Sequence, residues 1–196
     1  LTVVTGYKAD AVNFPGINTA ENTDFETTGE VASLACSMDA LKGECVVSYG
    51  DIMFRSHVLN QLLECEADIG VVVDANWKQE RAETTKRTMD LVACSHAYTG
   101  DYFDDEVSEL TRLDSAMSEG EANGEWIGLA KFSAKGSELL RAELDSMKSD
   151  GSLVTASMND LFNRLIDGGA KPQVVYITGN WLDVNDAFDL ARARNF

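Results

Sequence analysis

The amino-acid sequence predicts a single α/β domain with a central sheet that helices cover. Short β-rich runs alternate with segments whose apolar residues recur at helical spacing, which is typical of strands joined by helices. Residues 69–73 are continuously apolar, as expected of a strand buried on both faces. A chain of 196 residues with 44% hydrophobic and 25% charged side chains is long enough to bury one substantial core. We therefore expect one domain over residues 1–196.

Helical and strand patterns alternate regularly in the first half of the chain. Val31, Leu34 and Met38 share one face of a helix. Val58 and Leu62 repeat that spacing further on. In chain order we expect a strand over 1–5, a helix over 29–41, a strand over 45–49, a helix over 56–66 and a strand over 69–73.

The second half continues this alternation after a polar stretch. The charged composition of residues 77–87 predicts a surface excursion, and the acidic run over 101–106 predicts a solvated loop. The remaining expected elements are a strand over 91–94, a segment over 124–129 that leads into a helix over 136–147, a helix over 158–166, a strand over 174–177 and a helix over 187–194.

The chain is strongly acidic, with 33 Asp and Glu against 16 Lys and Arg and a formal charge of −17. Proteins attract nucleic acid mainly with Lys and Arg, so a nucleic-acid partner is not expected. An anionic small substrate is compatible with this charge if a divalent metal, a helix N-terminus or a few local cations offset the field. The composition therefore predicts metal dependence, although solubility or a salty environment explains the charge equally well.

The cysteines and the hydropathy indicate a reducing cytoplasm. Cys36, Cys45, Cys65 and Cys94 form no C-x-x-C pair, and with two histidines in the chain a structural zinc site is not expected. Buried free thiols explain them best. No apolar run approaches the ~18 residues that a membrane span requires, and no signal-peptide pattern opens the chain.

Asp51 is the first candidate for a metal-binding carboxylate. It follows an apolar run that stops at Gly50, so it lies at the carboxyl end of the expected strand. Ligands of open α/β sheets bind outside the carboxyl ends of the strands. The alternative is an ordinary turn, because Gly and Asp are both common in turns.

Five short sequence blocks, in order along most of the chain, resemble the sugar-phosphate and phosphocholine-type nucleotidyltransferases. The blocks are residues 3–8, 31–34, 48–51, 124–128 and 179–185. Ser-Tyr-Gly-Asp-Ile, Gly-Glu-Trp-Ile-Gly-Leu and Trp-Leu-Asp-Val-Asn-Asp together look most similar to the cytidylyltransferase domains of phosphonate biosynthesis, which are often fused to phosphoenolpyruvate mutase. The resemblance implies a Rossmann-like three-layer sandwich with a mostly parallel central sheet.

The resemblance also implies a reaction. An oxygen of a small phosphonate or phosphate acceptor, such as 2-aminoethylphosphonate, attacks the α-phosphorus of CTP, and pyrophosphate leaves. Positioning, cations and Mg²⁺ supply most of the catalysis of such a step. The implied partners are thus CTP, the acceptor and a fused phosphoenolpyruvate mutase domain, and the implied cofactor is Mg²⁺.

In this family the Gly-Asp aspartate and a late acidic or amide residue hold the metal, which implies Asp51 as the catalytic carboxylate with Asp183 and Asn185 as further ligands. Residues 183 and 185 are two apart, so in an extended segment both side chains point the same way. The alternative is that the segment caps the last helix, with Asn185 or Asp186 as the N-cap residue. Both can hold together.

The resemblance assigns the substrate contacts as well. It implies that Ala32, Ser33 and Gly50 contact the nucleotide, although an ordinary helix start explains the first two equally well.

On the acceptor side, the resemblance implies that Trp126 packs on an amine through cation–π attraction and that Glu125 pairs with its charge. Asp160 is a further candidate for the same ammonium group. The alternatives are a core position for Trp126 and an exposed helix position for Asp160.

One departure from the family pattern concerns the triphosphate. The family's N-terminal glycine-rich loop, with its arginine and later Pro-Lys pair, has no match here, and residues 1–8 match the family's second strand. We therefore expect the N-terminal βα unit to be encoded upstream of residue 1. The alternatives to a phosphonate cytidylyltransferase are a phosphocholine or sugar-1-phosphate nucleotidyltransferase and a noncatalytic binding module.

Overall fold

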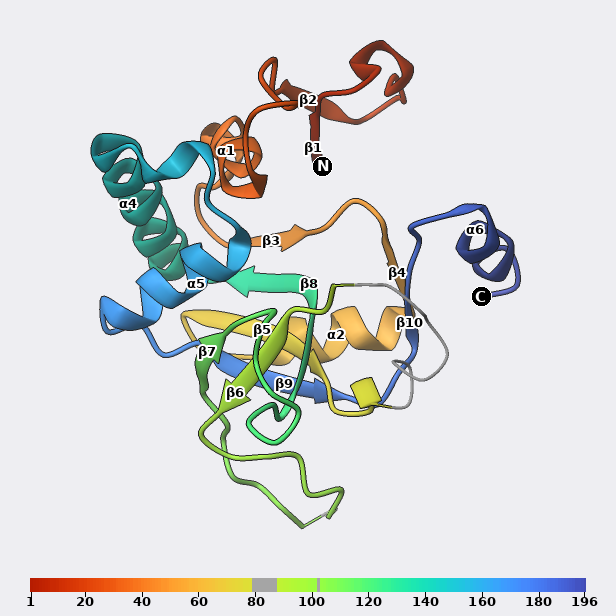
Figure 1. Ribbon diagram of the computed structural model, residues 1–196, viewed down its shortest axis with the longest axis vertical. Helices are drawn as coiled ribbons and strands as arrows, with labels where there is room; N and C mark the ends of the chain where they lie inside the picture. The colour runs from red at the N-terminus through yellow and green to blue at the C-terminus, as the bar shows by residue number, and fades with distance from the viewer. Residues whose placement is uncertain (79–87, 102) are drawn as a thin grey trace.

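The computed structural model describes residues 1–78, 88–101 and 103–196, and its elements follow the expected alternation (Figure 1). The strands are β1 (Thr2–Thr5), β2 (Asn18–Glu21), β3 (Cys45–Ser48), β4 (Ile52–Phe54), β5 (Ile69–Asp74), β6 (Leu91–Cys94), β7 (Leu110–Leu113), β8 (Gly124–Phe132), β9 (Gln173–Ile177) and β10 (Trp181–Asp183). The helices are α1 (Glu30–Ala35), α2 (Ser56–Glu64), α4 (Ala134–Asp150), α5 (Met158–Asp167) and α6 (Ala187–Ala193).

Helices pack on both faces of the central sheet, which confirms the three-layer arrangement (Figure 1). Successive side chains of a strand point to opposite faces, and the fully buried strand β5 shows this directly. Val71 and Val73 join the core cluster formed with α4 and α5, whereas Val72 joins the cluster that contains Val58 and Leu62 of α2. The continuous apolar run therefore marks a strand buried between two layers, as the sequence predicts.

The sheet is mixed, so the expectation of a mostly parallel sheet is corrected. β3, β5, β6 and β9 share one direction, but β8 lies among them in the opposite direction and β7 runs against β6. Within the described part of the chain, β5 and β9 are the one parallel neighbouring pair of this sheet. The difference comes from β8, which pairs antiparallel with three strands that lie far from it in sequence, β3, β5 and β6.

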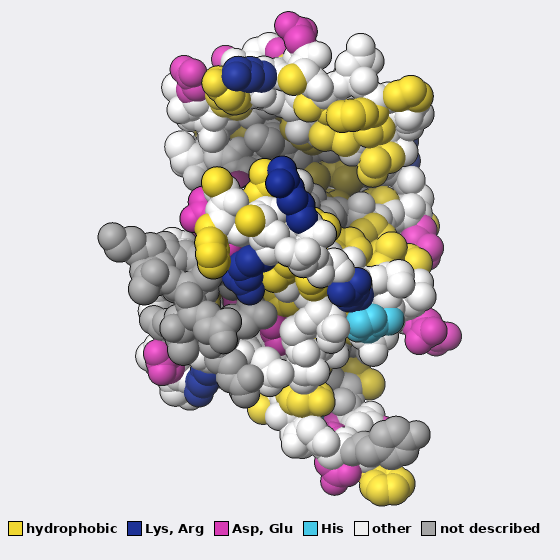
Figure 2. Space-filling view, turned by 90° about the vertical axis from the view of Figure 1, so that its right-hand side faces the viewer, with side chains coloured by type: hydrophobic (Ala, Val, Ile, Leu, Met, Phe, Trp, Pro, Cys, Tyr) yellow, Lys and Arg dark blue, Asp and Glu magenta, His cyan; other side chains and the backbone are white. Residues whose placement is uncertain are grey.

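Two smaller strand pairs flank the central sheet. β4 and β10 pair antiparallel, with Ile52 opposite Asp183 and Phe54 opposite Trp181. β1 and β2 pair in parallel at the end of the molecule that also holds α1 (Figure 1). Hydrophobic side chains gather on the surface at this end (Figure 2), and β1 is only partly buried. Whether a βα unit precedes it stays a prediction.

The helix expected over 29–41 is shorter than its apolar pattern. α1 ends at Ala35, and a separate 3₁₀ turn, Met38–Ala40, follows. The Ser37 hydroxyl donates to the Leu34 carbonyl at 2.7 Å. A serine side chain that bonds to nearby backbone competes with the helical hydrogen bonds, and here the helix stops.

The expected surface excursion over 77–87 begins with a buried residue. Trp77 packs with Met89, Leu91 and Met117 in a small core cluster, so its assignment to the surface is wrong. Residues 79–87 lie outside the described part of the chain.

All four cysteines are free, but burial is uneven. Cys65 is buried, Cys45 and Cys94 are half-buried, and Cys36 is exposed, so the expectation of buried thiols holds fully at Cys65 alone. Among the helices that the structure describes, none combines the length and the apolar character needed to cross a bilayer.

The loop between β6 and β7 contains a histidine held by two carboxylates, and this predicts a pH-dependent stability. His96 Nε2 lies 3.0 Å from Asp104 Oδ2, and Nδ1 lies 2.9 Å from Glu106 Oε2. The hydrogen bond to Asp104 raises the His96 pKa above its usual 6.5. The protonated ring therefore stabilises the fold below pH 6.5, and this contribution is lost as the pH rises through the raised pKa.

Replacing His96 with glutamine is expected to flatten the pH dependence of unfolding between about pH 6 and pH 8, the range in which a raised histidine pKa acts. Urea midpoints measured across this range check the prediction. His57→Gln, at an exposed position of α2, is the matched control. Equal pH profiles for the two variants would contradict it.

Candidate functional site

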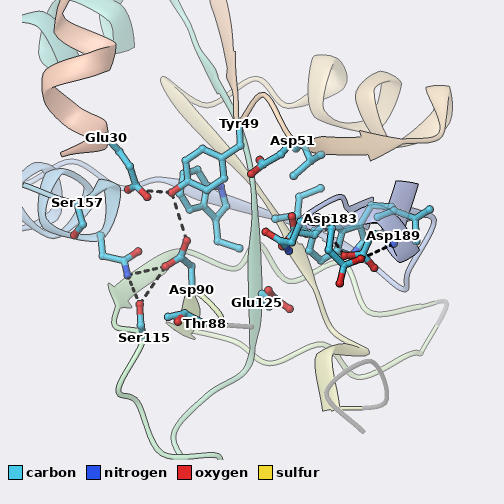
Figure 3. Close-up of a pocket in the computed structure, with 18 of the residues that line it drawn as sticks. Glu30, Tyr49, Asp51, Thr88, Asp90, Ser115, Glu125, Ser157, Asp183 and Asp189 are labelled. Atoms are coloured by element: carbon cyan, nitrogen blue, oxygen red, sulfur yellow. Dashed lines mark hydrogen bonds between the residues drawn. The ribbon is translucent and has the colours of Figure 1, made fainter. Parts of the chain in front are cut away.

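A cavity of about 850 Å³ opens where several chain segments meet beside β8. Its walls come from the start of α1, the β3–β4 connection, the start of α5 and the segment from β10 into α6 (Figure 3). Carboxylates dominate the polar lining, and Arg192 supplies a cation. The cavity is large enough for a nucleotide-sized or drug-sized ligand.

Five of the residues predicted from sequence line this one cavity. They are Asp51, Glu125, Trp126, Asp183 and Asn185. The segments that carry them are far apart in sequence, and the fold brings them together as expected. Their individual roles stay predictions.

Asp51 and Asp183 stand on paired segments. β4 and β10 are antiparallel, and beyond their last pair the Val184 N–H donates to the Asp51 carbonyl at 2.9 Å. Asp51 is exposed and Asp183 is half-buried. The strand pairing therefore fixes the backbone that carries Asp51 relative to the backbone that carries Asp183.

The segment after β10 lines the cavity and also caps the last helix, so the capping alternative is confirmed and the metal role stays a prediction. The N-cap residue of α6 is Asp186, whose carboxylate accepts from the Phe188 N–H at 2.7 Å and the Asp189 N–H at 2.9 Å. Asn185 precedes the cap and lines the cavity. Its own N–H donates to Asp189 at 3.2 Å.

The donor set suits a hard divalent cation. Two carboxylates and one amide oxygen, from Asp51, Asp183 and Asn185, face the same cavity, and Mg²⁺ prefers such oxygens. In the described residues, no group of three or more Asp, Glu, His or Cys side chains is arranged to hold a metal by itself. Mg²⁺ commonly binds one or two carboxylates and completes its shell with waters and substrate phosphates, so this set fits it.

A second polar group on the cavity wall was missed from the sequence. The Tyr49 hydroxyl lies 3.4 Å from both Glu30 Oε2 and Asp90 Oδ2, and Asn159 Nδ2 donates to Asp90 Oδ1 at 2.8 Å (Figure 3). The Ser115 hydroxyl lies 3.2 Å from the same Asp90 oxygen. We call these five residues the acidic wall.

Tyr49 keeps its proton within the acidic wall. Burial raises the pKa of its phenol far above the usual 10, and the negative charges of Asp90 and Glu30 raise it further. The phenol is therefore protonated near neutral pH and can donate a hydrogen bond to either carboxylate.

Gly128 explains why Tyr49 reaches the cavity. Gly128 has a φ of 81°, and a Cβ atom there would lie 2.2 Å from the Tyr49 ring. A glycine inside a strand often marks the close approach of another group. This glycine, inside an otherwise bulky buried strand, was the signal that could have identified Tyr49.

Trp126 is mainly a core residue with an edge on the cavity. It is 2% exposed, its ring centroid lies 5.2 Å from that of Tyr49 and 5.0 Å from that of Phe162, and its indole donates to the Leu129 carbonyl. The core alternative for Trp126 is thus confirmed. Glu125 is also 2% exposed.

Comparison with known proteins identifies the fold class of the chain. No protein-family model matches the chain. It is 24% identical over 190 residues to the CTP:phosphoglutamine cytidylyltransferase of Campylobacter jejuni, a match that covers 86% of this chain and 68% of that protein. The inositol-1-phosphate CTP transferase of T. maritima superposes with a TM-score of 0.66 at 16% identity, over 96% of this chain and 70% of the other. The chain has a Rossmann-like nucleotidyltransferase fold.

A second solved structure supports this nucleotidyltransferase fold. The CTP:phosphocholine cytidylyltransferase of Streptococcus pneumoniae matches with a TM-score of 0.67 at 13% identity, over 100% of this chain and 77% of the other. The cytidylyltransferase-like fold predicted from five sequence blocks is therefore confirmed.

Four predicted site residues do not line the cavity of this nucleotidyltransferase fold. Ala32 is buried in α1, and the Ser33 hydroxyl accepts from Asn22 Nδ2 at 3.0 Å. Gly50 is exposed between β3 and β4. Asp160 forms a capping box at the start of α5, where it accepts from the Ser157 N–H at 2.8 Å. A structural position explains Asp160, and no contact with a substrate is assigned to it.

Proposed function

We propose that this chain is the catalytic domain of a Mg²⁺-dependent cytidylyltransferase that moves CMP from CTP to a phosphonate such as 2-aminoethylphosphonate. The observation that carries the proposal is the single cavity of a nucleotidyltransferase fold in which Asp51 and Asp183 stand on paired segments. The three relatives described above are all CTP-dependent transferases by name, which supports CTP as the donor.

The reaction needs positioning and charge neutralisation. A bond forms between an acceptor oxygen and the α-phosphorus of CTP, and the bond from that phosphorus to the pyrophosphate oxygen breaks. When bound by Asp51, Asp183 and Asn185, Mg²⁺ supplies positive charge to the phosphate oxygens. The chain itself orients the reactants with the cavity walls, and Arg192 adds a cation there.

The acidic wall supports an acceptor that carries an amine. Glu30 and Asp90 present two carboxylates, and the half-buried Tyr49 ring lies beside them. An ammonium group gains from both carboxylates and aromatic faces. A sugar phosphate has no such charge, so the wall favours an amine-bearing phosphonate or phosphocholine over a sugar 1-phosphate.

Replacing Asp90 with asparagine is expected to raise the KM for 2-aminoethylphosphonate by about tenfold, because one charge next to the ammonium is removed. The KM for propylphosphonate, an analogue that keeps the phosphonate but lacks the amine, is expected to stay unchanged. Steady-state kinetics with both acceptors check this, and Asp145→Asn on the exposed face of α4 is the control. An equal change in KM for the two acceptors would show that the acidic wall does not recognise the amine.

The experiment that tests the function is product analysis of the full-length protein with CTP and Mg²⁺. Mass spectrometry is expected to find CMP joined to 2-aminoethylphosphonate when this acceptor competes with phosphocholine and glucose 1-phosphate. CMP joined to phosphocholine instead would establish the runner-up function. Absence of every product, from folded protein, would favour the noncatalytic binding module.

The proposed fusion partner is a phosphoenolpyruvate mutase domain, and the proposed location is the cytoplasm. Both come from the sequence resemblance and from the cysteine pattern. Sequencing of the complete reading frame tests the first, and cell fractionation tests the second.

A further inference from the structure

We propose that Asp74 is a positioning residue, whose buried carboxylate fixes the turn before β10 and so sets where Asp183 stands in the cavity. This inference rests on the proposed function, because it concerns the placement of a proposed metal ligand. Asp74 does not line the cavity, so any effect on the reaction must pass through the residues it holds.

The carboxylate of Asp74 is buried and fully used. The residue is the last of β5 and is 0% exposed. Oδ1 accepts from the Asn76 N–H at 2.8 Å and from the Gly179 N–H at 3.1 Å, and Oδ2 accepts from the Trp181 indole at 2.8 Å. A buried carboxylate is tolerated when hydrogen-bond donors surround it. Here one donor, the Gly179 N–H, belongs to the turn before β10, and another, the Trp181 indole, belongs to the first residue of β10.

The turn that Asp74 holds has a left-handed backbone at two successive residues. Gly179 and Asn180 both have positive φ, 78° and 67°, in the region that glycine and asparagine adopt more readily than other residues. The Asn180 carbonyl accepts from the Arg55 N–H at 3.0 Å. The Asp74 carboxylate supplies a second hydrogen bond to this backbone, at the Gly179 N–H.

The turn that Asp74 holds leads into β10, the strand that carries Asp183. Trp181 follows the turn, is buried with Val72 and Ile127, and pairs with Phe54 across the β4–β10 ribbon. Two residues further on, Asp183 pairs with Ile52, next to Asp51. A continuous connection therefore runs from Asp74 through the indole and the ribbon to the two proposed metal ligands.

Asp74→Asn is the sharpest test because it keeps the shape and removes one acceptor. The amide can serve the two backbone donors with its oxygen, but its NH₂ group then faces the indole N–H. In the full-length enzyme we expect kcat to fall about tenfold and the Mg²⁺ concentration for half-maximal rate to rise, with the KM for CTP little changed. Trp181→Phe removes the donor instead and is expected to give the same pattern.

A readout independent of activity is the indole resonance of Trp181 in a ¹H–¹⁵N NMR spectrum. We expect it to shift in Asp74→Asn and to respond to Mg²⁺ in the wild type. The double variant Asp74→Asn with Trp181→Phe is expected to lose less than the sum of the single changes, because the donor–donor clash is gone.

Lys131→Met is the matched structural control. Asp74 pairs with Glu125 near the start of β8, and Lys131 is buried near the other end of that strand. Its ammonium donates to the Leu63 and Cys65 carbonyls at 2.9 Å each. This variant is expected to lower the melting temperature and leave the Mg²⁺ dependence unchanged.

The kinetics and stability of the two variants decide between a positioning role and a purely structural role. If Asp74→Asn and Trp181→Phe lose stability as Lys131→Met does while keeping the wild-type kcat and Mg²⁺ dependence, the inference is overturned. If Asp74→Asn does not fold, the Trp181→Phe kinetics decide in the same way. Wild-type protein that turns over no acceptor contradicts the proposed function, whereas normal wild-type turnover with unaffected variants contradicts this inference alone.

Discussion

Asp51→Asn in the full-length protein is expected to reduce kcat by about 100-fold or more, because it removes charge from the carboxylate that we propose binds the metal. Thermal unfolding should not change. The Asp51 side chain is exposed, and the bond that ties this residue to Val184 uses its backbone carbonyl, which asparagine keeps. Paired measurements of kcat and melting temperature separate the two effects.

Asp183→Ala is expected to reduce turnover to a similar extent. Asp145→Asn, on the exposed face of α4 and away from the cavity, is the charge-matched control and should keep the wild-type rate. Turnover at the wild-type level in Asp51→Asn would remove Asp51 from the metal site. Loss of turnover in the control as well would point to the general charge of the protein.

Trp126→Ala is expected to lower the free energy of unfolding by about 3–5 kcal/mol, the usual cost of removing a buried aromatic side chain. The ring packs between Tyr49 and Phe162, and its N–H is bonded to Leu129 inside the core. Urea titration of the variant measures the change. An effect on the KM for the acceptor is expected in addition, because Tyr49 loses its neighbour.

Trp126→Phe separates packing from the indole hydrogen bond. It keeps most of the aromatic volume, so its loss of stability should be well below that of the alanine variant. Wild-type stability in Trp126→Ala, together with a raised KM, would show that the ring belongs to the substrate pocket and not to the core.

Sequence patterns predicted the five helices of the described residues and the strands β1, β3, β5, β6 and β9 because they report local physics, but they did not predict β2, β4, β7 and β10. The apolar run over 69–73 predicts β5, and the spacing of Leu161, Phe162 and Leu165 predicts α5. The gathering of Asp51 and Asp183 was implied by the family resemblance, and the pairing of β4 with β10 accounts for it.

The direction of β8 could not be predicted. All nine residues of β8, Gly124–Phe132, are buried, so the strand carries no alternation, and its direction depends on partners far along the chain. The start of α5 was a different case. The pair Ser157 and Asp160 forms a capping box, a local signal that competes with the substrate role predicted for Asp160.

The acidic wall is the part of the site that could least be predicted from the sequence. Asp90 and Asn159 are 69 residues apart, and Glu30 accepts from the Met158 N–H across 128 residues. No spacing rule joins residues so distant. Their meeting follows from the packing of α1 and α5 against the cavity, where Gly29 allows close approach to the Ala156 carbonyl.

Pyrophosphate release by the full-length protein tests the central claim most directly. CTP, UTP, ATP and GTP are each offered with Mg²⁺ against 2-aminoethylphosphonate, phosphocholine and glucose 1-phosphate. We expect release with CTP and the phosphonate, and its loss when EDTA removes the metal. Release with no nucleotide–acceptor pair, from protein shown to be folded, would contradict the assignment of this cavity as a cytidylyltransferase site.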